Sequence, residues 1–161
     1  MSVTFNADEI FEMAEEIERN GATFYREAAE KSSDKDALEF LKGMADMEEE
    51  HFRIFAEMRK ELNEKDKEPV SFDPDNEAAM YLQAMADAHG TEGKISVDKK
   101  LTGSESINEV LEIAINAEKD SISYYSALKD YVPSSQDKIN KIIREEIGHL
   151  AILKNELQKR S

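Results

Sequence analysis

A chain of 161 residues is long enough to bury one hydrophobic core without disulfides, and it contains no cysteine. The absence of cysteine excludes thiolate catalysis and any zinc, iron or iron–sulfur centre held by cysteine within this chain. Its 36 acidic and 21 basic residues give a net charge of −15, which repels the phosphates of nucleic acids and of anionic membranes. We therefore expect neither nucleic acid nor a membrane among its partners.

The start of the chain and its hydropathy favour a cytoplasmic location. Residues 1–6 contain neither a basic segment nor an apolar segment of the kind found in secretory signal peptides. No stretch of the sequence approaches the apolar length of a membrane span. We expect a cytoplasmic protein with a single domain over residues 1–161.

Two helices are predicted in the first half from capping residues and from apolar residues that recur with helical period. Asn6 and Glu9 form the pattern of a capping box, which is followed by a helix to about Lys31. Asp34 is the N-cap of a second helix that runs to about Asn63. Because the turn between them is short, we expect the two helices to be antiparallel neighbours.

A second pair of helices is predicted in the last third of the chain. Ser106 and Glu109 form another capping box at the start of a third helix, and residues 133–135 form the turn before a fourth. An offset of 100 residues superimposes the first helix on the third, and an offset of 98 superimposes the second on the fourth. The polar positions matched in this way are Glu18 with Glu118, Tyr25 with Tyr125, Glu48 with Glu146 and His51 with His149. We therefore expect two helical hairpins related by an approximate two-fold axis.

The segment from about residue 64 to residue 105 differs from the rest in composition. Asp73 and Pro74 predict the start of a short helix over about residues 75–88, which Gly90 ends. We interpret His89 as a residue at this helix end rather than a metal ligand. A connection of this length suits a crossover that travels the length of a bundle. The predicted fold is an all-α four-helix bundle with two hairpins and a long crossover that contains a short extra helix.

Each predicted long helix carries a glutamate midway along a face that is otherwise apolar. These residues are Glu18, Glu48, Glu118 and Glu146. Burying an ionised carboxylate costs on the order of several kcal/mol unless it is paired, and no arginine or lysine is in register with these four. Two divalent cations would balance four carboxylates, so the pattern predicts a two-metal site.

Two histidines complete the predicted ligand set. His51 and His149 each follow a glutamate by three residues, which places both side chains on one face of the helix. One glutamate from each of two helices and Glu-x-x-His from each of two others is the known pattern of dinuclear carboxylate bundles. Carboxylate and imidazole ligands without thiolates favour iron or manganese. The predicted ligands are Glu18, Glu48, His51, Glu118, Glu146 and His149.

Other polar residues close to this pattern receive different interpretations. Glu49, Glu50 and Glu145 lie one or two residues from ligand positions, so we interpret them as solvated surface residues. Glu15 precedes Glu18 by one helical turn, and we place it at the rim of the site rather than among the ligands.

Two tyrosines and two small residues share the faces of the predicted ligands. The hydroxyls of Tyr25 and Tyr125 either hydrogen-bond the ligand carboxylates or are satisfied within ordinary aromatic packing, and the sequence leaves both alternatives open. Gly21 and Ser121 are small where the predicted site is crowded, which leaves room for a ligand side chain or for a neighbouring helix.

This pattern resembles the rubrerythrin branch of the ferritin-like superfamily over about residues 6–63 and 106–160. The likeness is carried by Glu18 with Tyr25, Glu48 with His51, Glu118 with Tyr125 and Glu146 with His149. The resemblance implies a ferritin-like fold, a homodimer, and two iron ions bridged by Glu48 and Glu146. It also implies the terminal ligands of each ion, which are Glu18 and His51 on one and Glu118 and His149 on the other.

Two features depart from rubrerythrins. The chain lacks a cysteine-ligated rubredoxin-type domain, so any reductase activity requires a separate electron-donor protein. Rubrerythrins also have an additional glutamate one turn from the ligand of the third helix, where this chain has Ile115 and Ser121. This second departure argues against the metal-shifting peroxidase mechanism of that family.

The resemblance implies an oxidoreductase that reacts with peroxide or dioxygen at two iron ions, with manganese and zinc as the alternative metals. Two other functions would use the same ligands. One is ferroxidase-type binding or storage of iron, which calls for a large hollow shell. The other is a non-catalytic metal-binding bundle whose site holds zinc or no ion.

Overall fold

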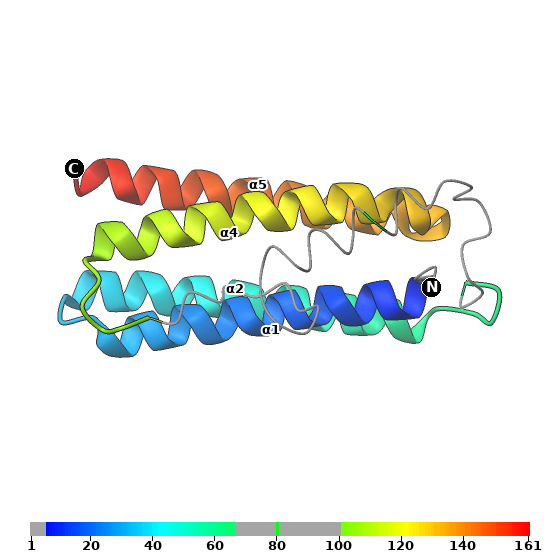
Figure 1. The fold of residues 1–161 in the computed structure, drawn as a ribbon, viewed down its shortest axis with the longest axis horizontal. Helices are drawn as coiled ribbons and strands as arrows, with labels where there is room; N and C mark the ends of the chain where they lie inside the picture. The colour runs from blue at the N-terminus through cyan, green and yellow to red at the C-terminus, as the bar shows by residue number, and fades with distance from the viewer. Residues whose placement is uncertain (1–5, 67–79, 81–100) are drawn as a thin grey trace.

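A computed structural model describes residues 6–66, 80 and 101–161, and within these residues four long helices form a bundle (Figure 1). The helices are α1 (Ala7–Lys31), α2 (Lys35–Lys60), α4 (Ile107–Leu128) and α5 (Gln136–Lys159). Two short 3-10 turns, η1 (Lys129–Tyr131) and η2 (Pro133–Ser135), connect α4 to α5. No strand occurs in the described residues. The predicted all-α fold class is confirmed.

The first helix of each hairpin begins at the capping box that the sequence predicts. In α1 the side chain of Asn6 accepts a hydrogen bond from the backbone N–H of Glu9, and the Glu9 carboxylate accepts one from the backbone of Asn6. Ser106 and Glu109 make the same reciprocal pair at the start of α4. These bonds satisfy backbone donors that a helix start otherwise leaves free.

The helices are arranged as two antiparallel hairpins, α1 with α2 and α4 with α5 (Figure 1). Beyond the end of α2, Glu61 contacts Lys138 near the start of α5. At the opposite end of the bundle, the Leu101 carbonyl accepts a hydrogen bond of 2.7 Å from Nζ of Lys31. The chain between α2 and α4 therefore joins opposite ends of the bundle, as expected of a crossover, and α4 runs in the same direction as α2.

The predicted short helix over about residues 75–88 lies outside the described residues except at Met80, which is helical and exposed. His89 and Gly90 also lie outside them. Phe52, which follows His51 in α2, is half-buried, and the guanidinium of Arg19 lies over its ring, 5.0 Å from the ring centroid.

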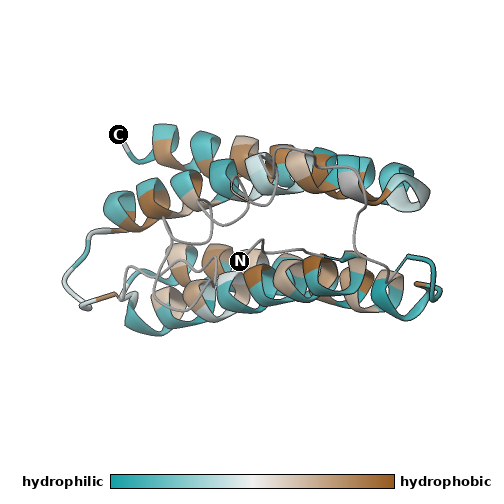
Figure 2. Cartoon of the chain, turned by 45° about the vertical axis from the view of Figure 1, so that its right-hand side comes forward, coloured by the Kyte–Doolittle hydropathy of each residue, from teal (hydrophilic) through white to brown (hydrophobic). Residues whose placement is uncertain are grey.

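The hydrophobic core consists of two clusters that lie on either side of the central glutamates. In α1, for example, Phe11 and Ile17 precede Glu18 and belong to one cluster, whereas Phe24 follows Glu18 and belongs to the other. The same division applies in α2, α4 and α5. Figure 2 shows the apolar residues on the helix faces that point into the bundle. The four glutamates are thus held midway between two apolar layers.

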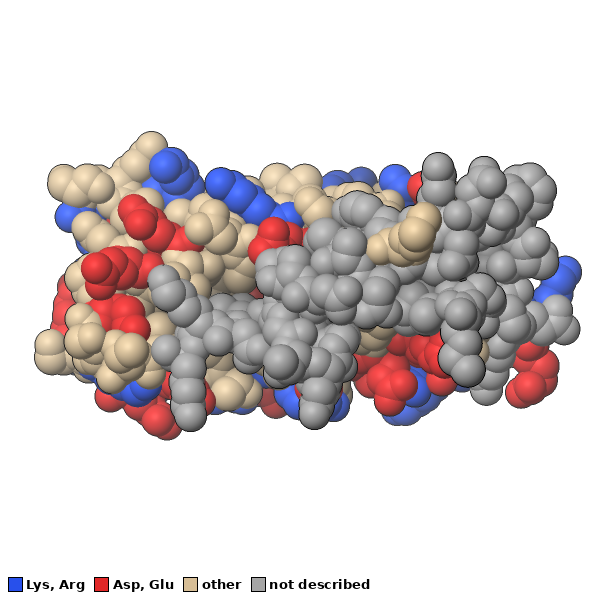
Figure 3. Space-filling model, viewed as in Figure 1, with Lys and Arg blue, Asp and Glu red and all other residues tan. Residues whose placement is uncertain are grey.

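The described surface carries interspersed acidic and basic side chains on the face shown in Figure 3. Within the described ranges, none of the helices has the length and apolar character needed to cross a lipid bilayer.

Candidate metal centre

The six predicted ligand residues lie together at the centre of the bundle. Their ligand atoms form two groups of four residues, and a smaller group of His51, Glu146 and His149 links the two; within each group all atoms lie within 4.8 Å of one another. The first group is Glu18, Glu48, His51 and Glu146, and the second is Glu48, Glu118, Glu146 and His149. All six side chains are buried, with residue exposures of 5% or less. Because Glu48 and Glu146 belong to both groups, the arrangement offers two adjacent cation positions that share two carboxylates.

The two histidines face the carboxylates with the same ring nitrogen. Nδ1 of His51 lies 2.5 Å from Oε1 of Glu146 and 3.5 Å from Oε2 of Glu18. Nδ1 of His149 lies 3.7 Å from Oε1 of Glu48 and 3.9 Å from Oε1 of Glu118. The two imidazole rings stack, with centroids 4.9 Å apart and planes inclined by 11°. The i, i+3 spacing on α2 and α5 produces this matched pair.

Unpartnered polar atoms test whether the cluster suits metal ions. Among the described residues, five buried side-chain nitrogen or oxygen atoms make no hydrogen bond of normal geometry, and four of them belong to this cluster, although two of the four, Nδ1 of His51 and Oε1 of Glu146, lie 2.5 Å apart. These four are Oε2 of Glu18, Nδ1 of His51, Oε1 of Glu146 and Nδ1 of His149. Buried polar atoms in folded proteins are normally hydrogen-bonded. A set of oxygen and imidazole nitrogen atoms left free around one small space fits divalent cations.

The carboxylates have strongly altered acidities in the absence of cations. Burial, together with the negative charge of Glu48, raises the pKa of Glu118 to about 8. Burial and the neighbouring carboxylates also raise the pKa of Glu18 and of Glu146 well above the ordinary range. Burial acts in the same direction on Glu48, but its contacts with His149 and Glu18 outweigh burial and lower its pKa. The metal-free cluster therefore holds protons at neutral pH, and binding cations would release them.

Burial lowers the pKa of a histidine, which is opposite to its effect on the pKa of a glutamate. Burial alone lowers the pKa of His51, but its contact with Glu146 outweighs this effect, so the pKa is raised. The pKa of His149 is raised in the same way by its contact with Glu48. Each ring is thus poised to carry a proton that neutralises part of the carboxylate charge when no metal is present.

The two tyrosines connect the hairpins across the cluster. The hydroxyl of Tyr25 on α1 donates a hydrogen bond of 3.0 Å to Oε1 of Glu118 on α4, and Tyr125 on α4 donates to Oε1 of Glu18 on α1. Both rings are also buried in the apolar clusters. Of the two interpretations left open by the sequence, the structure thus supports hydrogen bonding to the carboxylates.

Gly21 leaves room for the close approach of the Glu48 side chain of α2. A Cβ atom at this position would lie 3.1 Å from Oε2 and 3.2 Å from Cδ of Glu48, closer than most real Cβ contacts. Ser121, the matching residue of α4, is also buried. The small residue on α1 therefore leaves the space that the Glu48 carboxylate occupies.

We expect Gly21→Ala to weaken metal binding about tenfold, because the new methyl group displaces the Glu48 carboxylate from its place in both groups. Calorimetric titration of the metal-free protein with Mn²⁺ measures this effect. Gly43→Ala in α2 is the matched control, since a Cβ there meets nothing within 4 Å. Equal affinities for the two variants would show that Glu48 tolerates the displacement.

The structure corrects the interpretation of Glu145, which we predicted to be a solvated surface residue. Oε2 of Glu145 lies 2.8 Å from Nε2 of His51, and the side chain is 37% exposed. Glu49, by contrast, pairs with surface arginines, and Glu50 is exposed, as expected. The sequence missed Glu145 because its partner is on another helix, 94 residues away.

Glu15 lies outside both groups, in agreement with its predicted position at the rim. Its carboxylate accepts a hydrogen bond of 3.2 Å from the guanidinium of Arg59, which also binds Asp8 at 2.9 Å. Arg59 therefore pairs with acidic side chains in the N-terminal part of α1 and not with the central glutamates.

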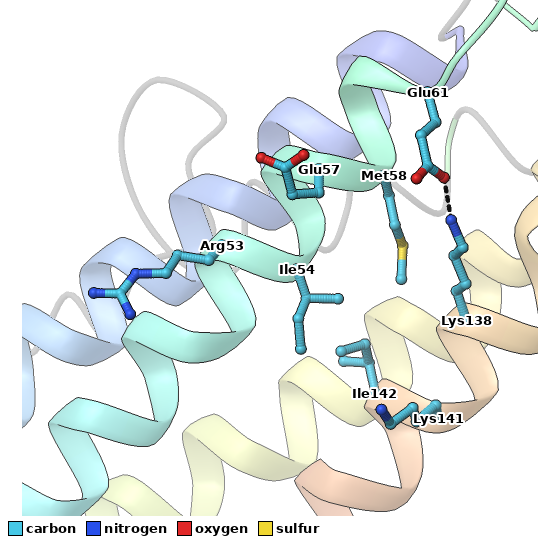
Figure 4. Close-up of a pocket in the computed structure, with 8 residues that line it drawn as sticks. All are labelled: Arg53, Ile54, Glu57, Met58, Glu61, Lys138, Lys141 and Ile142. Atoms are coloured by element: carbon cyan, nitrogen blue, oxygen red, sulfur yellow. Dashed lines mark hydrogen bonds and ion pairs between the residues drawn. The ribbon is translucent and has the colours of Figure 1, made fainter.

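A separate pocket of about 360 Å³ lies between α2 and α5 (Figure 4). Ile54, Met58 and Ile142 provide its apolar lining, and the ion pair of Lys138 with Glu61 borders it. None of the six predicted ligands lines this pocket. It is therefore distinct from the cluster.

Comparison with known proteins gives one informative match. No protein-family model and no curated protein sequence matches the chain. A crystal structure of a protein from Thermotoga maritima, which carries the assignment of a ferritin-like diiron-carboxylate protein, is similar with a TM-score of 0.69 and 26% sequence identity. The similarity covers 98% of this chain and 98% of that one. The four-helix bundle described above is therefore a ferritin-like fold.

Proposed function

We propose that this chain is a non-haem dinuclear iron protein. The observation that carries the proposal is the pair of buried four-residue groups that share Glu48 and Glu146 and contain four unpartnered donor atoms. In this proposal Glu48 and Glu146 hold both ions. Glu18 and His51 complete one position, and Glu118 and His149 complete the other. The assignment carried by the similar Thermotoga maritima protein supports the same function.

The donor chemistry favours iron. Four carboxylates and two imidazoles are mainly hard ligands, which suit iron and manganese, and the chain has no cysteine to offer a softer site. Four carboxylate charges and two divalent ions also give a neutral cluster, which removes the repulsion among the buried carboxylates. Manganese and zinc are the alternatives that elemental analysis distinguishes.

We further propose an oxidoreductase that consumes peroxide or dioxygen. Two bound ferrous ions would supply one electron each, which gives the two electrons that reduction of peroxide to water requires. The residues of the chain provide the surroundings: the two apolar clusters exclude water, and Tyr25 and Tyr125 orient Glu118 and Glu18 by hydrogen bonds. Burial raises the pKa of Tyr25, so its hydroxyl keeps the proton it donates to Glu118.

Electrons would come from a separate donor protein, because this chain has no cysteine with which to hold a rubredoxin-type or iron–sulfur centre that could pass electrons to the site. We also propose a homodimer as the assembly. Sedimentation analysis tests this assembly against a large shell of the kind needed for iron storage.

The decisive experiment is anaerobic loading of the metal-free protein with Fe²⁺, followed by exposure to peroxide in the presence of excess reductant. We expect two irons per chain, a near-ultraviolet absorption change on oxidation, and repeated consumption of peroxide. A site that retains only zinc, or binds no ion, would contradict the proposal. A single oxidation followed by accumulation of iron in a large assembly would favour storage instead.

A further inference from the structure

Only one of the two histidines has a carboxylate partner on its outer nitrogen. Nε2 of His51 lies 2.8 Å from Oε2 of Glu145. An ionised carboxylate accepts hydrogen bonds but does not donate them, so Nε2 carries the hydrogen in this pair. When a cation takes the place of the proton on Nδ1, this nitrogen presents its lone pair toward Glu18 and Glu146, and the ring is already in the tautomer that binds a metal.

His149 lacks the equivalent partner. The offset of 98 residues that superimposes His51 on His149 also superimposes Met47 on Glu145, so a half-buried thioether matches the carboxylate. Within residues 6–66, 80 and 101–161, the carboxylate contacts of His149 are all made through Nδ1, and Glu145 acts on this ring through its charge, without a hydrogen bond to Nε2. Nδ1 of His149 is also farther from its nearest carboxylate, at 3.7 Å rather than the 2.5 Å of His51.

The two positions are otherwise closely matched. Each group contains three glutamates and one histidine, two of the glutamates are common to both, and one tyrosine hydroxyl binds a terminal glutamate of each. The carboxylate of Glu145 is thus a chemical difference between them that acts directly on a ligand imidazole. Such a partner fixes the tautomer and orientation of a ligand imidazole and raises its basicity, with effects on metal affinity of about 10- to 100-fold.

We infer that Glu145 is a positioning residue that makes the two metal positions unequal, so that the ion beside His51 binds more tightly than the ion beside His149. This inference rests on the proposed metal centre. Within the described part of the chain, no hydrogen bond fixes the tautomer or the orientation of the His149 ring before a cation binds, whereas the bond to Glu145 already fixes both for His51. The position beside His51 therefore fills first as metal is added.

Titration of the metal-free protein with Co²⁺, followed by calorimetry and visible absorption, tests the inference. The wild type should bind two ions in steps whose affinities differ by about tenfold or more. Glu145→Ala should weaken the tighter step about 10- to 100-fold and leave the other nearly unchanged. Glu145→Gln keeps an oxygen that accepts the hydrogen bond from Nε2 but lacks the charge, so it should weaken the tighter step less than Glu145→Ala does. Met47→Glu, which gives His149 a carboxylate, should strengthen the weaker step.

Glu50→Ala is the control, because it removes an exposed carboxylate two residues from Glu48 and should change neither step. Equal weakening of both steps by Glu145→Ala, or an effect no larger than that of Glu50→Ala, would overturn the inference and leave the metal centre intact. Failure of the wild type to bind Co²⁺ at all would overturn the proposed function, and the inference with it.

Discussion

Replacing Glu146 by alanine is expected to abolish binding of both metal ions. Its carboxylate belongs to both four-residue groups, is 1% exposed, and includes one of the unpartnered oxygens of the cluster. Its loss leaves each position with three protein groups. Three carboxylates then face two divalent cations, so the loaded cluster has a net positive charge. We expect iron to bind this variant roughly 100-fold more weakly than the wild type. After loading with excess Fe²⁺ and removal of free iron by gel filtration, elemental analysis should therefore find less than a tenth of the wild-type iron content.

Glu118→Ala provides the contrast, because Glu118 belongs to one group only. We expect this variant to retain one ion per chain, at the position beside His51. Removing one carboxylate also relieves repulsion in the metal-free state, so neither variant should lose its helical circular dichroism. Glu146→Gln, which preserves the side-chain volume, gives a second test. Two irons per chain in Glu146→Ala would refute the shared role of this residue.

Chelation of the bound metal is expected to lower the melting temperature, and to lower it more at about pH 8 than at about pH 5. Cations that bind only the folded state at 1,000 times their Kd stabilise it by about 4 kcal/mol per site, which corresponds to roughly 10 °C for a chain of this size. Differential scanning calorimetry of metal-loaded and chelated protein measures the difference. Equal melting temperatures at about pH 8 would argue against a buried metal centre.

The pH dependence follows from the acidities of the metal-free cluster. The pKa of Glu118 is raised to about 8 from an ordinary value of 4.5, so between these values the folded state holds a proton that the unfolded chain releases. This contribution to the free energy of unfolding is complete below about pH 4.5 and is lost as the pH rises through about 8. The raised pKa values of His51 and His149 act in the same direction. Metal ions replace these protons, so their stabilising effect increases with pH.

Much of the fold could be predicted from the sequence because its signals are local. Capping boxes at Asn6 and Ser106 and the apolar repeats define helices whose starts the structure confirms. The repeat between the halves predicts the hairpins, and the length of the segment after α2 predicts the crossover. The short helix predicted within the crossover is not tested, since nearly all of it lies outside the described residues.

The candidate site could be predicted only in part. The glutamates and histidines are recognisable because charged residues interrupt apolar faces, and the structure brings all six together. Their role as ligands stays a prediction. The bond between Glu145 and His51 was missed because the rotation of α5 about its axis decides whether a residue beside a ligand meets water or a neighbouring helix. The tyrosine bonds were also undetermined, since they join the two hairpins.

Each four-residue group contains three residues from one hairpin and a single glutamate from the other. Neither half of the chain can therefore enclose a cation by itself, and the donation is reciprocal: Glu146 completes the first group and Glu48 completes the second. Metal occupancy and the docking of the two halves are consequently linked equilibria. A perturbation that separates the hairpins should release the ions, and bound ions should in turn oppose that separation.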